Sequence, residues 1–385
     1  MDGKTIIILL DAFRENYIHK DRTPFLYSLK QKHKTLTVKP EFGFCERTEI
    51  LHNRGPSNGG FFTAIALKKK PSDIRLLFGS VLLKLKIKNK FIFVNKVFRK
   101  LLALIFRVLN LKIPIYKIPL LEIGIWKFTE DEFDLTDAKF FPGGFLDLTL
   151  KSKKISFKHF TSLNSKMEVK DDFERLSLSI LELATNDIAF VYFGLTDWLG
   201  HLYGPNSKEF NSFLTKLDQK LEDWYLEVKK EEINVVLLGD HGMIEVEHNF
   251  DIISFLVTAL KSKGYKYYTD YILFTDSTIC RIYFLNKIKT EDDINVKRLI
   301  NLETNFKVWD KPDYIGQEYG DLIVLANPGI LFYPNNFNTS ELKGMHGYMS
   351  DNLDNKGMLL CDFDIKIYDK EVELKDVTKY IIKSL

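Results

Sequence analysis

The chain has 385 residues, of which 45% are hydrophobic and 28% charged, a composition typical of a globular protein with a proper core rather than a disordered chain. The formal net charge of +3 is too small to indicate a nucleic-acid or membrane partner by itself. The three cysteines are odd in number and far apart, which excludes a disulfide framework and a cysteine-based zinc site. This cysteine usage fits a reducing compartment.

The N-terminal stretch MDGKTIIILL predicts no signal peptide. An acid stands at position 2 and the apolar run begins at Thr5, so the basic, apolar and cleavage regions of a signal peptide have no room. No apolar stretch reaches the roughly 18 to 20 residues that span a bilayer. We therefore expect a cytoplasmic protein, with any membrane contact made at its surface.

The first predicted element is a buried strand that ends in an acid, because TIIILLDAF is apolar over a short run and stops at Asp11. A loop and helix follow over residues 14–32, with Thr23 and Pro24 as the cap and the first-turn proline. The stretch TLTVKP, residues 35–40, alternates and ends at a proline, which predicts a second core strand. That strand leads into the loop FGFCERTE.

Residues 74–121 differ in composition from the rest of the chain, with eleven Lys or Arg residues and no acid. Within them, residues 91–111 carry large apolar side chains near helical spacing with basic residues opposite, which predicts a basic amphipathic helix. One interpretation is a surface helix that packs its apolar face on the core. The other is contact of residues 74–117 with an anionic membrane surface or a lipid-linked substrate. We expect no nucleic-acid partner.

Two helices flank the next apolar run, IAFVYF. A helical pattern over residues 172–185 precedes it, and residues 207–230 form a long amphipathic helix after it. Asp218 on the long helix is interpreted as a solvated carboxylate, because acids on helix surfaces are mostly exposed. It is therefore left out of the candidate site.

The domain organisation is predicted to be a single domain over residues 1–385 with inserted segments. Residues 74–160 are the basic and cap insertion, in which the proline- and aromatic-rich stretch 113–145 is interpreted as a lid over the site. Residues 252–340, with their tyrosine-rich strands, are expected to form a second, smaller lobe. We find no internal repeat and no low-complexity linker.

Carboxylates and imidazoles follow the apolar runs or lie in a glycine-rich turn. They are Asp11, Asp197, His201, Asp240, His241 and His346. Asp240 and His241 end the run VVLLGDH, whereas Asp197 and His201 are four residues apart and share one face of a predicted helix. Such side chains at the carboxyl end of a strand are ligands for a divalent cation, although Asp-His alone is also compatible with a capped turn.

In their order along the chain these motifs resemble the alkaline phosphatase superfamily, in its branch of type I phosphodiesterases and nucleotide pyrophosphatases. The matching stretches are LLDAF, FGFCERTEILHNRGP, TDWLGHLYGP, GDHGM and GMHGY. The resemblance implies an α/β fold with a mostly parallel central sheet and helices on both faces. It also implies two divalent metal ions, with zinc expected and manganese as the alternative. One would be bound by Asp197, His201 and His346, and the other by Asp11, Asp240 and His241.

The sequence departs from the family pattern at the nucleophile, which the resemblance implies to be a Thr, Ser or modified Cys. In the family it lies ten residues before the glycine of a T-G-x-x-P motif. The stretch HNRGP puts Asn53 in place of that glycine, so the nucleophile position falls on Gly43. Arg47 falls where related sulfatases carry a functional arginine, which supports this register.

Three hypotheses for the nucleophile remain open. A shifted loop could bring the Cys45 thiol to the metals, or Thr48 could act from within the following helix. In the third hypothesis no side chain attacks, and either water is activated at the metals or the site serves only to bind. Cys45 is also compatible with a small buried residue that has no chemical role.

The resemblance implies a metal-dependent phosphoesterase or phosphotransferase. Its substrate would be a phosphodiester or pyrophosphate whose other half is a nucleotide, a glycan or a lipid carrier. The same metals would serve a sulfuryl or phosphonate ester hydrolase. A degenerate metal-bearing binding protein is the alternative outside the enzymes, and Gly43 is the feature that favours it.

Overall fold

The computed structural model describes residues 4–68, 100–101, 104, 118–119, 122, 125–129, 156–160, 171–285, 297, 303–338 and 340–384. The predicted helix 91–111 lies outside the described residues except at 100, 101 and 104, and so does most of the predicted lid. Among the residues that are described, no helix combines the length and the hydropathy needed to cross a bilayer.

The chain divides into two compact units. The first contains Met1–Gly60, Asp134–Glu247 and Leu342–Leu385, and the second contains Phe61–Phe133 and His248–Glu341. The single domain with an insertion at 74–160 and a smaller lobe at 252–340 stays a prediction.

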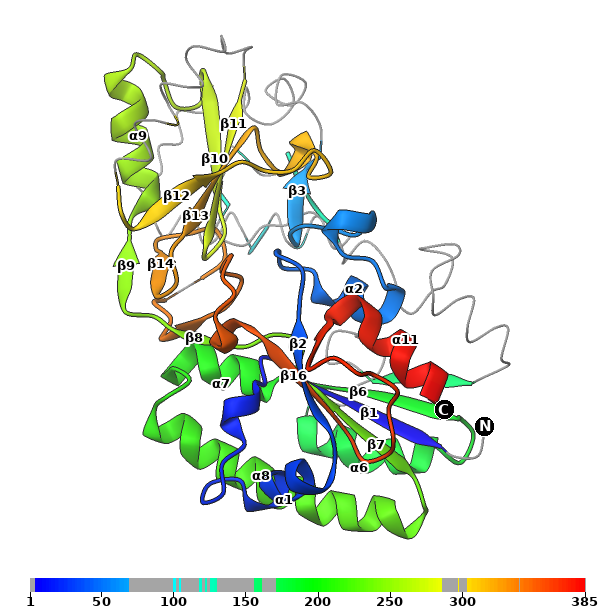
Figure 1. The fold of residues 1–385 in the computed structure, drawn as a ribbon. Coiled ribbons are helices and arrows are strands. Elements are labelled where there is room, and N and C mark those ends of the chain that lie inside the picture. The colour runs from blue at the N-terminus through cyan, green and yellow to red at the C-terminus, as the bar shows by residue number, and fades with distance from the viewer. Residues whose placement is uncertain are drawn as a thin grey trace. The chain divides into compact units, whose positions relative to one another are not determined.

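A seven-stranded sheet forms the centre of the first unit (Figure 1). Its order is β17 (Glu371–Glu373), β2 (Thr35–Lys39), β16 (Gly357–Cys361), β7 (Asn234–Leu238), β1 (Thr5–Leu10), β6 (Ile188–Phe193) and β5 (Phe157–Phe160). All neighbouring pairs are parallel except those of β16, which is antiparallel to both β2 and β7. The predicted α/β fold with a mostly parallel sheet is therefore confirmed.

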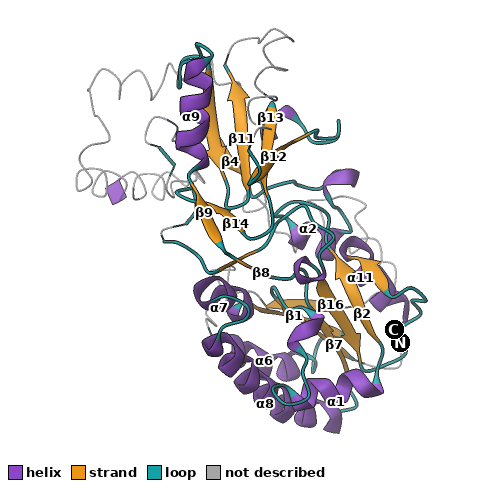
Figure 2. Ribbon diagram, turned by 60° about the vertical axis from the view of Figure 1, so that its left-hand side comes forward, coloured by secondary structure: helices purple, strands orange, loops and turns teal. Residues whose placement is uncertain are grey.

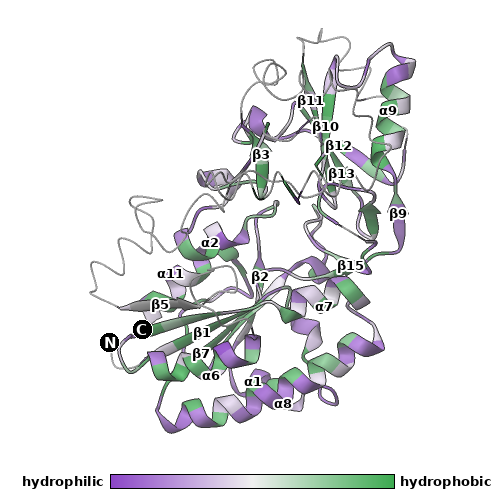
Figure 3. Ribbon diagram, turned by 180° about the vertical axis from the view of Figure 1, so that it is seen from behind, coloured by the Kyte–Doolittle hydropathy of each residue, from purple (hydrophilic) through white to green (hydrophobic). Residues whose placement is uncertain are grey.

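Helices cover both faces of this sheet, which is why its inner strand β1 is buried along its whole length (Figure 2). Ile6, Ile8 and Leu10 pack in the layer that holds α1 (Pro24–Lys32), α6 (Asp172–Glu182) and α8 (Lys208–Lys230). Ile7 and Leu9 point the other way, into the layer that holds α2 (Glu46–His52) and α11 (Leu374–Ser384). Figure 3 shows the resulting pattern, with apolar central strands between helices whose outer faces are polar.

The second unit is built on a four-stranded antiparallel sheet. Its order is β10 (Tyr271–Thr275), β11 (Ile279–Phe284), β13 (Leu322–Ala326) and β12 (Phe306–Trp309). Smaller elements of this unit are β3 (Ile65–Leu67), β4 (Trp126–Phe128), β9 (His248–Phe250), α9 (Ile252–Ser262) and β14 (Ile330–Phe332). Trp126, Phe274 and Tyr283 pack together in its core, which accounts for part of the aromatic content of this region.

Asp218 is not the solvated carboxylate that the helix pattern suggested, since only 1% of it is exposed. Its Oδ2 accepts a hydrogen bond from the Phe25 backbone N–H at 3.0 Å, and its Oδ1 accepts one from Leu26 at 2.8 Å. These N–H groups lie in the first turn of α1, where a helix has no internal partner for them, and the side chain of Thr23 does not cap them. Asp218 thus joins α8 to the start of α1.

We predict that Asp218→Ala lowers the free energy of unfolding by about 1–3 kcal/mol, because two buried N–H groups lose their acceptor. Urea denaturation followed by circular dichroism measures the change. Asp223→Ala is the matched control, since Asp223 is an exposed acid on the same helix. Equal stability of the two variants would show that Asp218 does not contribute in this way.

Candidate active site

Five of the six predicted ligands come from segments that follow three neighbouring strands. Asp11 follows β1, and Asp240 and His241 follow β7. Asp197 and His201 lie on α7 (Leu195–Tyr203), which begins just after β6. Because β1, β6 and β7 are parallel, their carboxyl ends lie at one edge of the sheet.

His346 reaches the same edge through a short ladder. It follows β15 (Gly344–Met345), which is antiparallel to β8 (Ile244–Glu245), and β8 comes just after the Asp240 segment. Gly347 has a φ of +73°, and a Cβ built on it would lie 2.2 Å from the Phe44 ring, so glycine lets the chain turn there. The Phe44 ring in turn packs edge-on against His346 at 5.5 Å between ring centroids.

Asp11, Asp240 and His241 form one group of candidate ligands, with donor atoms within 4.8 Å of one another. His241 Nε2 is 3.1 Å from Asp11 Oδ1 and 3.8 Å from Asp240 Oδ1. The Nδ1 of His241 lies 2.9 Å from the Gly242 carbonyl oxygen, which can only accept, so we place the proton on Nδ1. Nε2 then faces the two carboxylates, and in the neutral ring its lone pair has the orientation of a metal ligand.

The carboxylates of this group are held by neutral donors. Asp240 Oδ1 accepts hydrogen bonds from the backbone N–H groups of Ala12 at 3.1 Å and His241 at 3.0 Å. The Tyr192 hydroxyl donates to Asp11 Oδ2. These contacts fix the positions of the acids without neutralising their charge.

Asp197, His201 and His346 form the second group, again with donor atoms within 4.8 Å of one another. The Nε2 atoms of His201 and His346 lie 3.1 Å and 3.7 Å from Asp197 Oδ1. His201 Nδ1 donates to the Gly344 carbonyl oxygen at 2.8 Å, which leaves Nε2 as the ligand atom. Asp197 Oδ1 and His346 Nδ1 are buried and make no hydrogen bond, although such burial is costly. A buried carboxylate oxygen with two imidazole nitrogens as its neighbours fits a bound cation.

The electrostatics of the two groups differ. Burial and the charges of His241 and His201 hold the pKa of His346 well below its ordinary value, so this imidazole is neutral. Burial opposes protonation of His241 too, but the nearby carboxylates of Asp240, Asp11 and Glu46 raise its pKa well above the ordinary value. Burial also raises the pKa of Asp240, and the charges of Asp11 and Glu46 act in the same direction.

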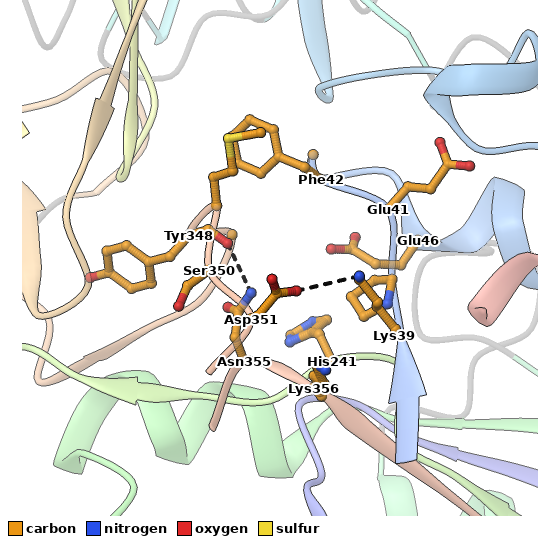
Figure 4. Close-up of a pocket in the computed structure, with 14 residues that line it drawn as sticks. Lys39, Glu41, Phe42, Glu46, His241, Tyr348, Ser350, Asp351, Asn355 and Lys356 are labelled. Atoms are coloured by element: carbon orange, nitrogen blue, oxygen red, sulfur yellow. Dashed lines mark hydrogen bonds and ion pairs between the residues drawn. The ribbon is translucent and has the colours of Figure 1, made fainter. Parts of the chain in front are cut away.

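A cavity of about 250 Å³ in the first unit opens onto this edge of the sheet (Figure 4). It is lined by Lys39, Pro40, Glu41, Phe42, Gly43, Glu46, His241, Gly347, Tyr348, Met349, Ser350, Asp351, Asn355 and Lys356. The lysines are paired with acids, Lys39 with Asp351 at 3.3 Å and Lys356 with Glu371 at 2.5 Å. The wall therefore carries charges of both signs beside apolar side chains.

The two side chains predicted as nucleophiles lie outside this wall. Cys45 is the N-cap residue of α2 and is 4% exposed, and Thr48 is fully buried with its hydroxyl donating to the Cys45 carbonyl oxygen at 2.9 Å. Neither lines the cavity or belongs to a group of candidate ligands. Gly43, the residue at the family's nucleophile position, does line it.

Arg47 lies beside the first ligand group. Its guanidinium carbon is 5.9 Å from the centroid of the Tyr192 ring, whose hydroxyl donates to Asp11. Burial opposes ionisation of Asp11, but His241, Tyr192 and the charge of Arg47 together lower its pKa. A positive charge is thus available next to Asp11.

Glu46 is a residue that the sequence did not single out. Its carboxylate lies within 4.8 Å of the ligand atoms of His241 and His346, and it lines the cavity. A signal was present, because Glu46 is an acid three residues after Gly43 at a strand-to-helix junction. However, Glu46 also precedes Arg47 on a predicted helix, and in the sequence a ligand at such a position looks the same as a solvated surface acid.

Comparisons with known proteins agree with the fold. A family model for type I phosphodiesterases / nucleotide pyrophosphatases matches residues 125–349, more than half of the chain. The solved structure of human ectonucleotide pyrophosphatase / phosphodiesterase 5 is similar, with a TM-score of 0.63 and 16% sequence identity over 99% of this chain and 95% of that one. The murine protein, as an inactive variant in complex with AMP, has a TM-score of 0.64 and 16% identity over 100% of this chain and 96% of that one. At 16% identity, the structural similarity is evidence for the fold alone.

We predict that His241 and His346 titrate far apart in metal-free protein. His241 should be protonated above the ordinary pKa of 6.5, whereas His346 should stay neutral below it. Two-dimensional imidazole NMR across a pH series, with His241→Ala and His346→Ala for assignment, measures both. Titration of both rings together near the ordinary value would contradict the charge distribution described above.

Proposed function

Because this chain belongs to the type I phosphodiesterase / nucleotide pyrophosphatase family, we propose that it is a metal-dependent phosphodiesterase or pyrophosphatase. Family and fold support a phosphodiester hydrolase. Metal dependence is supported by one observation, the meeting of two carboxylate and imidazole groups at the carboxyl edge of the sheet, beside a cavity.

The donor set fits two divalent ions. The proposed ligands of one ion are Asp197, His201 and His346, and those of the other are Asp11, Asp240 and His241. Three protein ligands for each ion leave room for substrate, as in catalytic sites, and nitrogen and oxygen donors suit zinc while tolerating manganese. When bound, the ions supply charge that stabilises the non-bridging and leaving oxygens of a phosphoryl group.

The chain's own residues orient the ligands and attract the substrate. The carbonyl groups of Gly242 and Gly344 hold His241 and His201 with their Nε2 atoms toward the carboxylates. Arg47 does not line the cavity, but it is long and its charge lies beside Asp11. Because guanidinium groups match phosphate oxygens, we assign Arg47 to binding an oxygen of the anionic phosphoryl group.

For the nucleophile we favour water over a side chain. Cys45 and Thr48 lie outside the cavity wall, and Gly43 on the wall has no side chain. In the proposed step the water oxygen forms a bond to phosphorus and its proton passes to solvent. The bond from phosphorus to the leaving oxygen breaks, and its electron pair stays on that oxygen.

The proposed substrate carries a nucleotide on one side of the scissile bond, which the AMP bound to the murine relative supports. A glycan or lipid carrier as the other half remains a proposal from the sequence. Contact of residues 74–117 with an anionic membrane surface is also a proposal from the sequence. So is a cytoplasmic location.

We predict that protein loaded with zinc or manganese holds about two ions per chain and hydrolyses p-nitrophenyl thymidine 5′-phosphate. Asp240→Ala and His241→Ala each remove a proposed ligand, so each should lose an ion and lower turnover roughly 100-fold or more. Elemental analysis and release of p-nitrophenol measure the two effects, with Asp223→Ala as the control.

Other outcomes of this experiment would favour the alternatives. Turnover of a sulfate or phosphonate ester in place of the phosphodiester would favour a sulfuryl or phosphonate hydrolase. Bound metals without turnover of any ester would favour a binding protein. Metal content near zero in folded protein would contradict the proposal itself.

We predict that Cys45→Ala and Thr48→Val keep turnover within roughly threefold of the wild type, since neither side chain lines the cavity. Steady-state kinetics of both variants, with metal content measured in parallel, provides the check. Loss of turnover in Cys45→Ala with both metals retained would restore the thiol as the nucleophile.

A further inference from the structure

Glu46 lies between the two groups of candidate ligands. Its carboxylate and the ligand atoms of His241 and His346 all lie within 4.8 Å of one another. His241 belongs to one group and His346 to the other, and their rings stack at 3.9 Å between centroids with 14° between planes. Glu46 therefore adjoins one member of each group. Figure 4 shows its side chain and His241 on the same cavity.

Glu46 has no cationic partner of the kind that the other acids of this wall have. Glu41 is paired with Lys375, and Asp351 with Lys39 at 3.3 Å. In the described part of the chain, no lysine or arginine nitrogen lies within 4.0 Å of the Glu46 carboxylate. Burial raises the pKa of Glu46, and the nearby charges of His241 and Arg47 act against that rise.

This trio does not make a third metal site. His241 uses Nδ1 for the Gly242 carbonyl oxygen, so only its Nε2 can bind an ion, and that atom already faces Asp11 at 3.1 Å. One imidazole nitrogen binds one ion. A carboxylate has two oxygens with separate lone pairs and can bind two.

We propose that Glu46 is a shared ligand whose carboxylate bridges the two ions of this centre. The proposal rests on the proposed function, because it requires both ions. Zinc lies about 2.0–2.2 Å from nitrogen and carboxylate oxygen ligands, so donors on one ion are at most roughly 4.4 Å apart. The donor atoms of Glu46, His241 and His346 lie within 4.8 Å of one another. A small side-chain movement would therefore bring Glu46 and either imidazole within binding distance of one ion.

The spacing of a two-metal centre suits such a bridge. Ions in these centres lie roughly 3.5–4 Å apart, a distance that one carboxylate spans with its two oxygens. Gly43 and Glu46 both line the cavity, and Gly43 presents no side chain that would compete with Glu46 for the ions. With three ligands from each group, a bridge makes each ion four-coordinate, and a substrate oxygen would be the fifth ligand.

The test is metal binding by Glu46→Gln, which keeps the shape of the side chain but removes its charge. Metal-free protein is titrated with zinc in competition with a chromophoric chelator. We expect the variant to bind at least one ion roughly 10- to 100-fold more weakly than the wild type. With manganese, electron paramagnetic resonance should show a spin-coupled pair in the wild type and uncoupled ions in the variant.

Glu49→Gln is the matched control, because Glu49 is a buried acid on the same helix whose carboxylate accepts a hydrogen bond from the Glu41 backbone N–H. It should bind both ions as the wild type does. Glu46→Asp, which keeps the charge on a shorter side chain, replaces Glu46→Gln if the latter does not fold, and weaker binding of one ion is expected there too.

If the wild type and the Glu46→Gln variant both bind two ions with equal affinity and equal spin coupling, Glu46 does not bridge the ions. That result leaves the proposed function intact. A wild type that binds no metal overturns the proposed function and the bridge together, so the two failures are distinguishable.

Discussion

Two carboxylates share one imidazole at the buried edge of the central sheet, and the surrounding structure depends on that concentration of charge. Asp11 and Asp240 both approach His241 Nε2, at 3.1 Å and 3.8 Å. Like charges in a buried site are costly unless they are paired or neutralised. Backbone N–H groups and the Tyr192 hydroxyl offset part of this cost. A divalent cation would offset the rest, and the same fold that creates the cost would then hold the ion in place.

The parts of this arrangement that the sequence predicted are those set by local patterns. Apolar runs that are followed by Asp11, Asp197 or Asp240 indicate strands and the edge at which their acids meet, because the carboxyl ends of parallel strands lie together. His346 is far along the chain from those strands, and it could be placed only through the motif resemblance. The structure accounts for it with the ladder between β8 and β15.

Other features depend on tertiary contacts that a local pattern does not contain. Asp218 has the sequence signature of a surface acid, yet it is buried because the start of α1 lies against it. Glu46 has the signature of a helix-surface acid, and only the approach of His241 and His346 distinguishes it. Cys45 was a candidate nucleophile because a thiol near the family's nucleophile position could attack phosphorus. Its burial at the cap of α2 followed from the turn of the backbone, which the register of the motif does not specify.

The antiparallel strand β16 has a consequence for how this protein is made in the cell. It lies between β2 and β7, so the central sheet stays in two pieces until Gly357–Cys361 has been synthesised. A nascent chain that has emerged only as far as β7 presents unpaired strand edges, which are prone to pair with other chains. Ribosome-bound and prematurely terminated chains would therefore need chaperone protection. The edge that carries the candidate ligands would assemble only after His346 and β16 have emerged, well after β1, β6 and β7.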